Sequence, residues 1–245
     1  MTVDILTVMW KEFKEILHLR GSKIGSLFVM IVPAFLFGVI FPLQFGSQWT
    51  ETPFSIIVWM VVPFILISTV IADSFAGERE RNTLETLLAS RLTEKSILLG
   101  KIFAAIIYAM AITLIIIILG LITVNLSNSE GGILLFSPKV FIAGLIAGFF
   151  TSSIAVNVGT LVSLRAATVR QAQQTLGIAM FVLFFSPSII AQFVPKSYLD
   201  SIETFFRAFE LNVIIAAILC ILLAVDIFLF LWTLARFKRN RMIFD

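Results

Sequence analysis

Long runs of apolar residues constrain this chain more than any other feature. A helix of about 20 mostly apolar residues is long enough to cross the hydrocarbon core of a bilayer. Apolar residues make up 59% of the 245 residues and charged residues only 13%, and the mean hydropathy is +1.04. Six such runs follow one another with little chain between them: 24–43, 54–72, 97–124, 140–164, 175–194 and 211–235. We therefore expect an all-α integral membrane protein, with six transmembrane helices in a single domain over residues 1–245.

The distribution of Lys and Arg predicts how these helices are oriented. Basic residues concentrate in the loops that lie on the cytoplasmic side of a membrane. Only Lys139, Lys196 and Arg207 fall in the loops of one side. The other 15 of the 18 basic residues lie in the N-terminal segment, in the loops after the second and fourth apolar runs, and in the C-terminal tail. This asymmetry predicts a multi-pass protein of the cell membrane with both termini in the cytoplasm, and it explains the net charge of +3 without a nucleic-acid partner.

The N-terminal segment 1–22 has the pattern of an amphipathic helix. Its larger apolar side chains share one arc at 100° per residue: Ile5, Leu6, Met9, Trp10, Phe13, Ile16 and Leu17. Lys11, Lys14, Glu15 and His18 lie opposite. Such a helix is expected to lie flat in the headgroup region of the bilayer, with Trp10 at the interface. One interpretation is a simple anchor; the other, compatible with it, is that the helix also helps to frame a docking surface for a cytoplasmic partner.

A polar loop over 77–92 separates the second and third apolar runs. Alternating Glu and Arg residues open it, and an apolar i, i+3, i+4 pattern follows at Leu84, Leu87 and Leu88. This pattern predicts a short amphipathic helix that ends near Ser90, with Asn82 as its N-cap and Glu85 as the reciprocal carboxylate. Thr93 and Glu94 are expected to begin the next membrane helix as N-cap and first-turn acid. The alternative is a solvated hairpin with no partner.

The sequence FAGERERNTLETLLASRLTEKSILLGK over 75–101 resembles the signature of type-2 ABC exporter permeases. In that family the segment is a coupling helix that docks into a cleft of a separate ATPase subunit. The resemblance extends to the layout of the whole chain. It implies two copies of the ATPase, which bind ATP and Mg²⁺, and a second permease subunit, identical or related. Two departures are Asn82, where the family usually has Gly, and Arg91, where it often has Pro. Left-handed or capping geometry tolerates Asn at such a position.

The resemblance implies that residues of this loop contact the ATPase, with the leucines filling an apolar cleft and the charged residues forming its rim. The expected contact residues are Glu78, Arg79, Glu80, Arg81, Asn82, Thr83, Leu84, Glu85, Leu87 and Leu88.

No ATPase, cofactor site or metal site is expected in this chain itself. A phosphate-binding loop needs Gly-x-x-x-x-Gly-Lys followed by Ser or Thr, and the single Gly-Lys pair, Gly100-Lys101, has Lys95 and Ile102 at the other required positions. One His and one Cys, Cys220, leave no metal-ligand spacing and no catalytic constellation. The chain is therefore not expected to be an enzyme by itself.

Two polar residues stand inside the apolar runs, where such groups face protein or water. Asp226 lies well inside the sixth run and Asn157 inside the fourth. Each either holds helices together or contributes to a transport pathway. Small residues also repeat at a spacing of four in the fourth run, which favours close helix packing: Gly144, Ala147, Gly148, Thr151, Ala155 and Gly159.

The segment 186–210 is expected to be broken. Ser186-Pro187-Ser188 interrupts the fifth run and Pro195 follows, and proline removes a helix hydrogen bond. The family that this chain resembles has short re-entrant helices here. The alternative is a kinked helix followed by a solvent-exposed loop. A secondary transporter or channel not driven by ATP is the alternative function, although matched broken helices are missing from the two halves. The transported substrate is left open.

Overall fold

The computed structural model describes residues 1–17, 30–52, 54–128, 132–198, 201, 204 and 209–237. Every regular element within these residues is helical, in agreement with the all-α prediction. Four of their helices are long and apolar enough to cross a membrane: Phe54–Glu80, Glu94–Ser127, Pro138–Ser163 and Asn212–Arg236. These correspond to the second, third, fourth and sixth predicted spans.

The first and fifth predicted spans are not among these four long apolar helices. A shorter apolar helix occupies Met30–Phe45, and residues 24–29 of the predicted first span lie outside the described residues. Helix α10 (Val169–Phe193) covers the fifth span with 25 residues, but its first two turns carry Arg170 and several glutamines. The count of six spans therefore stays a prediction.

The centre of the fold is the contact between α5 (Phe54–Ala72) and α9 (Pro138–Ser163), which pack more extensively than any other pair of described elements. Small residues make this contact possible. A Cβ atom on Gly144 would overlap the Trp59 indole, and one on Gly159 would overlap the Ile71 side chain. The small-residue pattern predicted for this helix is therefore confirmed, because glycine lets the two backbones approach closely.

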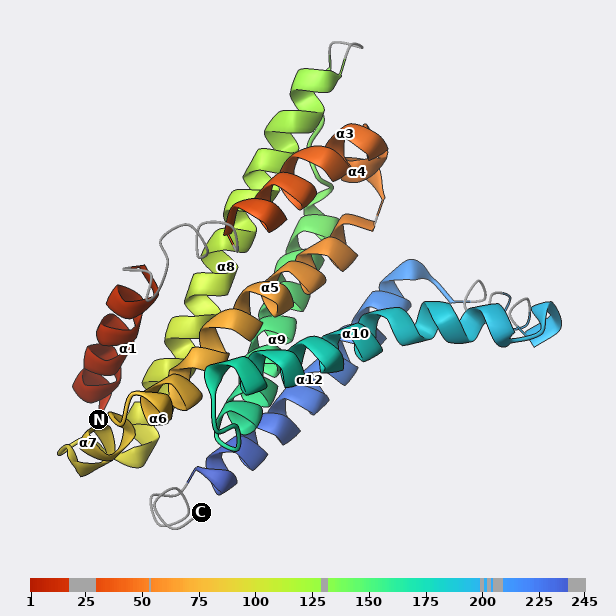
Figure 1. The fold of residues 1–245 in the computed structure, drawn as a ribbon. Coiled ribbons are helices and arrows are strands. Elements are labelled where there is room, and N and C mark those ends of the chain that lie inside the picture. Colours follow the sequence, from red (N-terminus) through yellow and green to blue (C-terminus); the bar gives the residue numbers. More distant parts are fainter. Residues whose placement is uncertain are drawn as a thin grey trace.

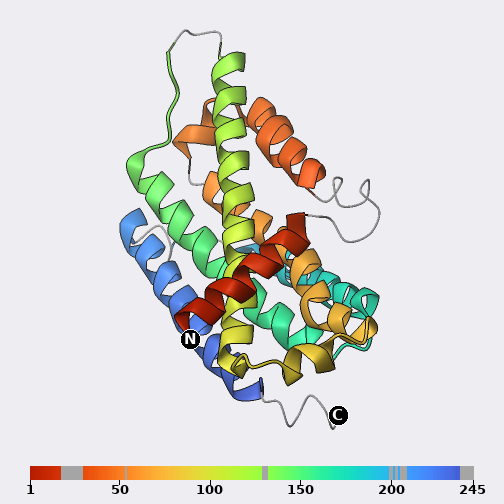
Figure 2. The same cartoon turned by 90° about the vertical axis from the view of Figure 1, so that its left-hand side faces the viewer.

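Helix α8 (Glu94–Ser127) packs against α5 and α9, and α1 (Thr2–Leu17) lies obliquely across α8 (Figure 2). At the crossing, a Cβ atom on Gly100 would lie 2.6 Å from the Val8 Cβ atom, so glycine at this position allows the close approach. The side of α1 that faces α8 carries Val8 and Glu12, both buried, whereas Leu6 and Trp10 are exposed. The position of α1 in the headgroup region stays a prediction.

The turns η1 (Leu36–Ile40), α3 (Phe41–Phe45) and α4 (Gln48–Glu51) cover the far end of α8. Trp49 is the largest buried side chain there and packs beside Gly120. These elements close one end of the helical bundle around an aromatic cluster that includes Phe41 and Phe45.

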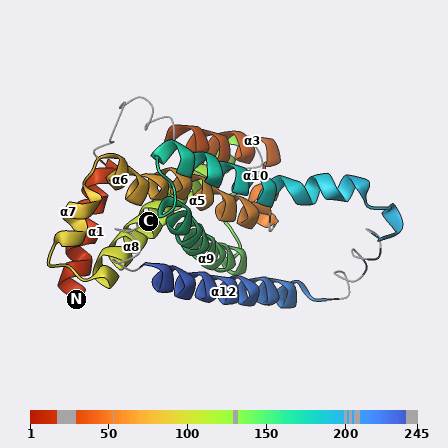
Figure 3. The same cartoon turned by 60° about the horizontal axis from the view of Figure 1, so that its bottom comes forward.

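Helix α12 (Leu211–Arg236) packs along α9, while α10 contacts α5 and α9. The far half of α10 extends away from the other helices (Figures 1 and 3) and is exposed. Helix α10 continues through Ser186-Pro187-Ser188 and ends at Phe193, before Pro195, so the helix end within the segment 186–210 lies after these three residues. A proline inside a membrane helix can be accommodated locally, as Pro63 is within α5. The rest of the segment 186–210 falls partly on residues outside the described set, and its re-entrant character stays a prediction.

Four separate parts of the chain meet at one end of the bundle, which we call the basic end. They are α1, the segment with α6 (Glu78–Glu80) and α7 (Leu84–Ala89), the connection from α9 to α10, and the last turn of α12 (Figures 1 and 2). These parts carry the basic residues that the sequence places on one side. Their meeting at one end is what the predicted topology requires, and the side of the membrane that they face stays a prediction.

Candidate functional site

The polar loop at the basic end begins with an irregular turn that α9 completes. Residues Asp73–Gly77 form a π-helical turn, η2, which continues α5. The Ser163 hydroxyl of α9 accepts hydrogen bonds from the backbone N–H groups of Phe75 (3.3 Å) and Ala76 (2.9 Å). It also donates one to the Ala72 carbonyl at 3.1 Å. A π-bulge leaves backbone groups without their usual partners, and this single buried hydroxyl supplies them. The start of the loop is thereby fixed to α9.

A buried charge cluster then fixes the loop to α8 and α1. The Lys101 ammonium, whose side chain is 1% exposed, donates to Glu12 Oε1 at 2.9 Å, to Glu78 Oε1 at 3.0 Å and to the Ser74 carbonyl at 2.9 Å. An ammonium has three protons to donate, so these three acceptors satisfy it fully. The cation also lies 5.1 Å from the centre of the Phe75 ring. One lysine of α8 thus holds three segments of the chain together.

Lys11 of α1 completes the charge balance of the cluster. Its ammonium lies 3.0 Å from Glu78 Oε1 and 3.4 Å from Glu12 Oε1. Burial by itself raises the pKa of the Glu12 carboxyl, but the attraction of Lys101 and Lys11 outweighs burial and holds that pKa below its ordinary value. Burial lowers the pKa of Lys11, and the nearby Glu12 and Glu78 carboxylates overcome this and raise it. Glu12 and Lys11 therefore each favour their charged form beside Glu78 and Lys101, in a place where an unpaired charge would be costly.

Arg79 and Glu80 connect the loop to the junction between α9 and α10. The Arg79 guanidinium donates to the carbonyls of Leu164 (2.8 Å) and Ala166 (2.9 Å), which follow the end of α9. Basic side chains stabilise the exposed carbonyls at a helix C-terminus. Glu80 Oε2 accepts a hydrogen bond from the backbone N–H of Val169 at 3.2 Å, at the first residue of α10. The two adjacent side chains therefore attach to consecutive helices.

Asn82 gives the loop its reversal in direction. It is the one non-glycine residue with positive φ (57°) among the described residues, and its N–H donates to the Arg79 carbonyl at 3.0 Å. Asn tolerates this left-handed conformation better than most residues, which explains why it can replace the Gly of the resembling family. The predicted N-cap role is wrong, because α7 begins at Leu84 after Thr83 and no side chain caps it. Arg81 pairs with Asp73 at 3.1 Å beside this turn.

The short helix α7 turns one side inward and leaves another exposed. Leu84 is 6% exposed and belongs to the hydrophobic core of the chain, and Leu87 packs partly against the same core. Thr83, Thr86 and Ala89 are exposed. The expectation that Leu84 fills a cleft of a partner is therefore corrected, since the core of this chain already surrounds its side chain. The side chains of Glu85 and Leu88 lie outside the described set.

Glu78 requires a similar correction. It was expected at a polar rim that contacts a partner, but its side chain is buried in the charge cluster with Lys101. The end of the loop follows the prediction: α7 ends at Ala89, before Ser90. Thr93 caps α8, its hydroxyl accepting a hydrogen bond from the N–H of Ser96 at 3.2 Å.

The two polar residues predicted within the apolar runs lie together. Asn157 Nδ2 of α9 donates to Asp226 Oδ1 of α12 at 3.4 Å and to the Ser153 carbonyl at 2.9 Å. Asn157 is fully buried. The pair joins α12 to α9, which favours the packing interpretation over the pathway interpretation, although a role in transport stays a prediction.

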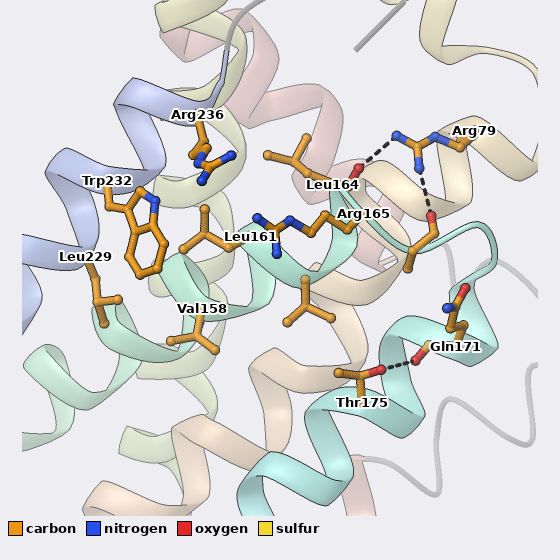
Figure 4. Close-up of a pocket in the computed structure, with 12 residues that line it drawn as sticks. Arg79, Val158, Leu161, Leu164, Arg165, Gln171, Thr175, Leu229, Trp232 and Arg236 are labelled. Atoms are coloured by element: carbon orange, nitrogen blue, oxygen red, sulfur yellow. Dashed lines mark hydrogen bonds between the residues drawn. The ribbon is translucent and has the colours of Figure 1, made fainter. Parts of the chain in front are cut away.

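A cavity of about 580 Å³ opens at the basic end, between the last turns of α9 and α12 and the first turns of α10 (Figure 4). Its lining includes three arginines, Arg79, Arg165 and Arg236, together with Trp232 and several aliphatic side chains of α9 and α12. The Arg165 side chain extends across the cavity in the direction of α12, which carries Trp232 and Arg236 (Figure 4).

Sequence reasoning missed three residues that organise this end of the chain: Glu12, Ser163 and Lys101. A signal existed for Lys101, because it is a lysine in the first turns of a long apolar helix, where a charge needs a partner. For Glu12, no pattern in the sequence pairs it with a residue 89 positions away. In the described residues no cluster of three or more His, Cys, Asp or Glu side chains is arranged to hold a metal ion.

The comparison with protein families agrees with the arrangement at the basic end. The family of ABC-2 type transporters matches residues 3–196 of this chain. This range includes α1 from its second residue, the polar loop, the charge cluster and the whole of α10. No curated protein matches the chain. Since the match covers far more than half of the 245 residues, the chain belongs to the ABC-2 type transporter family as a membrane-embedded permease component.

Proposed function

We propose that this chain is the permease subunit of an ATP-driven exporter, coupled through the loop 77–92 to a separate ATPase. The ATPase, present in two copies, would bind ATP and Mg²⁺ and supply the energy. Two permease subunits, identical or related, would form the translocation pathway between them. The family is generally paired with an ATPase subunit, which supports the first part of this proposal.

One observation carries the proposal: ion pairs and hydrogen bonds connect the loop that contains α7 to four other helices. Glu78 joins α8 and α1 through Lys101 and Lys11. Arg79 and Glu80 join the end of α9 and the start of α10. A displacement of α7 by a partner would therefore be passed to several membrane helices at once. A solvated hairpin has no need of such connections.

We divide the residues of the loop into two roles. Glu78 is buried and Arg79 is partly buried, and together with the exposed Glu80, which accepts a hydrogen bond from the Val169 N–H, they would transmit motion to the other helices. Other exposed residues would touch the ATPase: Arg81, Asn82 and Thr83 of the expected contact set, and in addition Thr86 and Ala89. Leu87, which is only partly buried, would contribute at the edge of the contact.

A second permease subunit is supported by the exposed apolar surface of α10. Large side chains on its far half, including Val182, Leu183 and Ile190, are exposed. Apolar residues at such positions need lipid or another protein beside them. In an assembled transporter, a second copy and the bilayer would share this surface.

The test is copurification of the ATPase with variants of α7. The probe is a phosphate-binding-loop ATPase from a reading frame adjacent to that of this chain, and both are expressed together. Thr86→Arg combined with Ala89→Arg should abolish copurification and the stimulated ATP hydrolysis, because two bulky cations would stand in the contact. Neither residue is buried, so insertion and folding should be unchanged. Ser47→Arg, at an exposed site on the opposite end, is the control. If both readouts persist in the α7 variant, the coupling role is wrong.

Orientation is tested separately by cysteine labelling in intact cells. Cys220→Ser removes the native cysteine, and single cysteines are then introduced at Ser47 and at Thr86, both exposed. An impermeant reagent should modify position 47 and leave position 86 unmodified until the membrane is permeabilised. The opposite pattern would place the basic end outside the cell.

A further inference from the structure

We propose that the cavity at the basic end binds the head group of an anionic phospholipid from the adjacent leaflet. The cavity holds about 580 Å³, within the range of small-molecule sites in proteins. This inference rests on the placement of the chain in a membrane and is independent of coupling to an ATPase.

The charge of the lining calls for an anion. Three arginines line the cavity, and none of its lining residues is acidic. Arg79 is held by the carbonyls of Leu164 and Ala166, but these bonds leave its positive charge uncompensated. Arg165 and Arg236 are exposed, and no carboxylate of the described residues lies within ion-pair distance of either. Guanidinium groups that share one cavity are favoured when a phosphate lies between them, since their planar donors bind phosphate oxygens in pairs.

The cavity also changes from polar to apolar in the direction of the membrane interior. Arg165 follows the end of α9, and Val158 lies seven residues earlier in the lining. Arg236 ends α12, and Leu229 lies seven residues earlier. At 1.5 Å per residue, both aliphatic positions lie about 10 Å deeper than the arginines. A phospholipid has the same order of groups, with its phosphate at the surface and its acyl chains below. A free phosphate has no apolar part that could contact the apolar walls.

Trp232 and the position of the cavity among the helices fit a bound lipid. An indole between apolar and polar surroundings is typical of the membrane interface, and basic pockets between helices at this depth favour anionic head groups. The described parts of α10 and α12 make little direct contact with each other. A head group held by Arg165 and Arg236 would bridge α12 to the junction of α9 and α10.

The tryptophans of the chain provide a direct measurement. Trp49 and Trp59 are each 1% exposed, while Trp232 is 41% exposed. In a Trp10→Phe background, quenching by lipids brominated on their acyl chains therefore reports mainly on Trp232. The full-length protein is placed in phosphatidylcholine nanodiscs that contain a small fraction of brominated phosphatidylglycerol or of brominated phosphatidylcholine. We expect phosphatidylglycerol to quench at a much lower mole fraction than phosphatidylcholine.

Variants assign this preference to the cavity. Each arginine near an anionic head group contributes roughly a fivefold preference for that lipid. The double variant Arg165→Gln with Arg236→Gln should therefore raise the mole fraction of phosphatidylglycerol that gives half-maximal quenching by about 25-fold. Arg91→Gln with Lys95→Gln removes two exposed charges from the same end, outside the cavity, and should keep the preference. Should the double glutamine variant misfold, Arg165→Lys with Arg236→Lys keeps the charge but loses paired donors, and it should weaken the preference without abolishing it.

Several outcomes would overturn the inference. Equal quenching by the two lipids in the parent protein would do so, as would equal losses in the cavity and control variants. Reversal of the quenching by glycerol 3-phosphate would assign the cavity to a soluble phosphate. If the parent protein shows no lipid preference and the arginine pair is instead needed for copurification of the ATPase, the cavity is a protein contact. Failure of the α7 variants to affect the ATPase leaves the lipid measurement unchanged, so the two proposals are tested independently.

Discussion

The Lys101 ammonium of α8 lies 2.9 Å from a carboxylate oxygen of Glu12 of α1, although 89 residues separate the two in the sequence. The same ammonium lies 3.0 Å from Glu78 Oε1 of the polar loop. Because these bonds converge on one buried cation, α1 and α6 cannot move independently of α8 without exposing an unpaired charge. This arrangement connects the N-terminal helix both to the loop and to a membrane helix.

Replacement of Lys101 by Met should strongly destabilise the protein. Methionine has similar bulk but leaves Glu12 and Glu78 with only Lys11 as a partner, and removing one member of a buried ion pair costs about 3–5 kcal/mol. Lys95→Met, on the exposed surface of the same helix, should change stability by less than about 0.5 kcal/mol. The measurement is the midpoint of thermal unfolding of the detergent-solubilised protein. Equal midpoints for the two variants would contradict the role of the cluster.

The charge cluster should make stability depend on pH at both extremes. The pKa of Glu12 is lowered in the folded protein, so its contribution is present above the ordinary value of 4.5 and is lost as pH falls through the folded pKa. The pKa of Lys11 is raised, so its contribution is present below 10.5 and is lost as pH rises through the folded pKa. Between these two pH limits, titration of Glu12 and Lys11 should leave the midpoint of thermal unfolding unchanged, so that the midpoint forms a plateau when plotted against pH.

The variant Glu12→Gln distinguishes the loss of stability at low pH that is due to Glu12, the acid limb of the pH dependence, from general acid denaturation. The variant should be less stable on the plateau, and its stability should fall less steeply with decreasing pH than that of the parent. Identical acid limbs in the two proteins would show that Glu12 does not titrate in the folded state as its surroundings imply.

Asn82 should tolerate glycine and reject β-branched residues. Its φ of 57° is readily adopted by Gly, whereas the left-handed conformation costs most L-residues roughly 1–2 kcal/mol. Asn82→Gly should therefore keep the thermal midpoint and ATPase copurification, while Asn82→Val should lower both. Lys95→Val, at an exposed position of α8 outside this contact, controls for the introduction of a β-branched side chain by itself. Equal behaviour of the Gly and Val variants at position 82 would contradict the left-handed turn.

Asp226 and Asn157 should show coupled effects on stability. Hydrogen bonds between membrane helices average about 0.6 kcal/mol and reach about 1.7 kcal/mol. Asp226→Ala and Asn157→Ala should each destabilise the protein, and the double variant should cost less than the two losses combined. Asp226→Asn removes the charge and keeps the shape. Strict additivity in the cycle would show that the 3.4 Å contact contributes nothing, and transport unaffected by Asp226→Asn at every pH would exclude a role for ionisation.

Much of this protein is determined by its sequence because a bilayer leaves few choices. Apolar runs of the required length form helices, since backbone groups in hydrocarbon need partners within their own segment. The small residues of α9, the cap at Thr93 and the short helix near Leu84 are local features with local signatures, and each was predictable. The resemblance around 75–101 indicated the family, which the match over residues 3–196 establishes.

Only the tertiary structure decided which face of each element turns inward. A helical period places Leu84 and Leu87 on one side of α7, but it does not say whether that side meets a partner or the core of the same chain. The alternating Glu and Arg residues had the composition of a solvated rim, and three of them instead connect α7 to α1, α8, α9 and α10. The reason is physical: charge pairing and hydrogen bonding depend on distances between atoms that lie up to 91 residues apart in the sequence, and no periodicity within one segment encodes such distances.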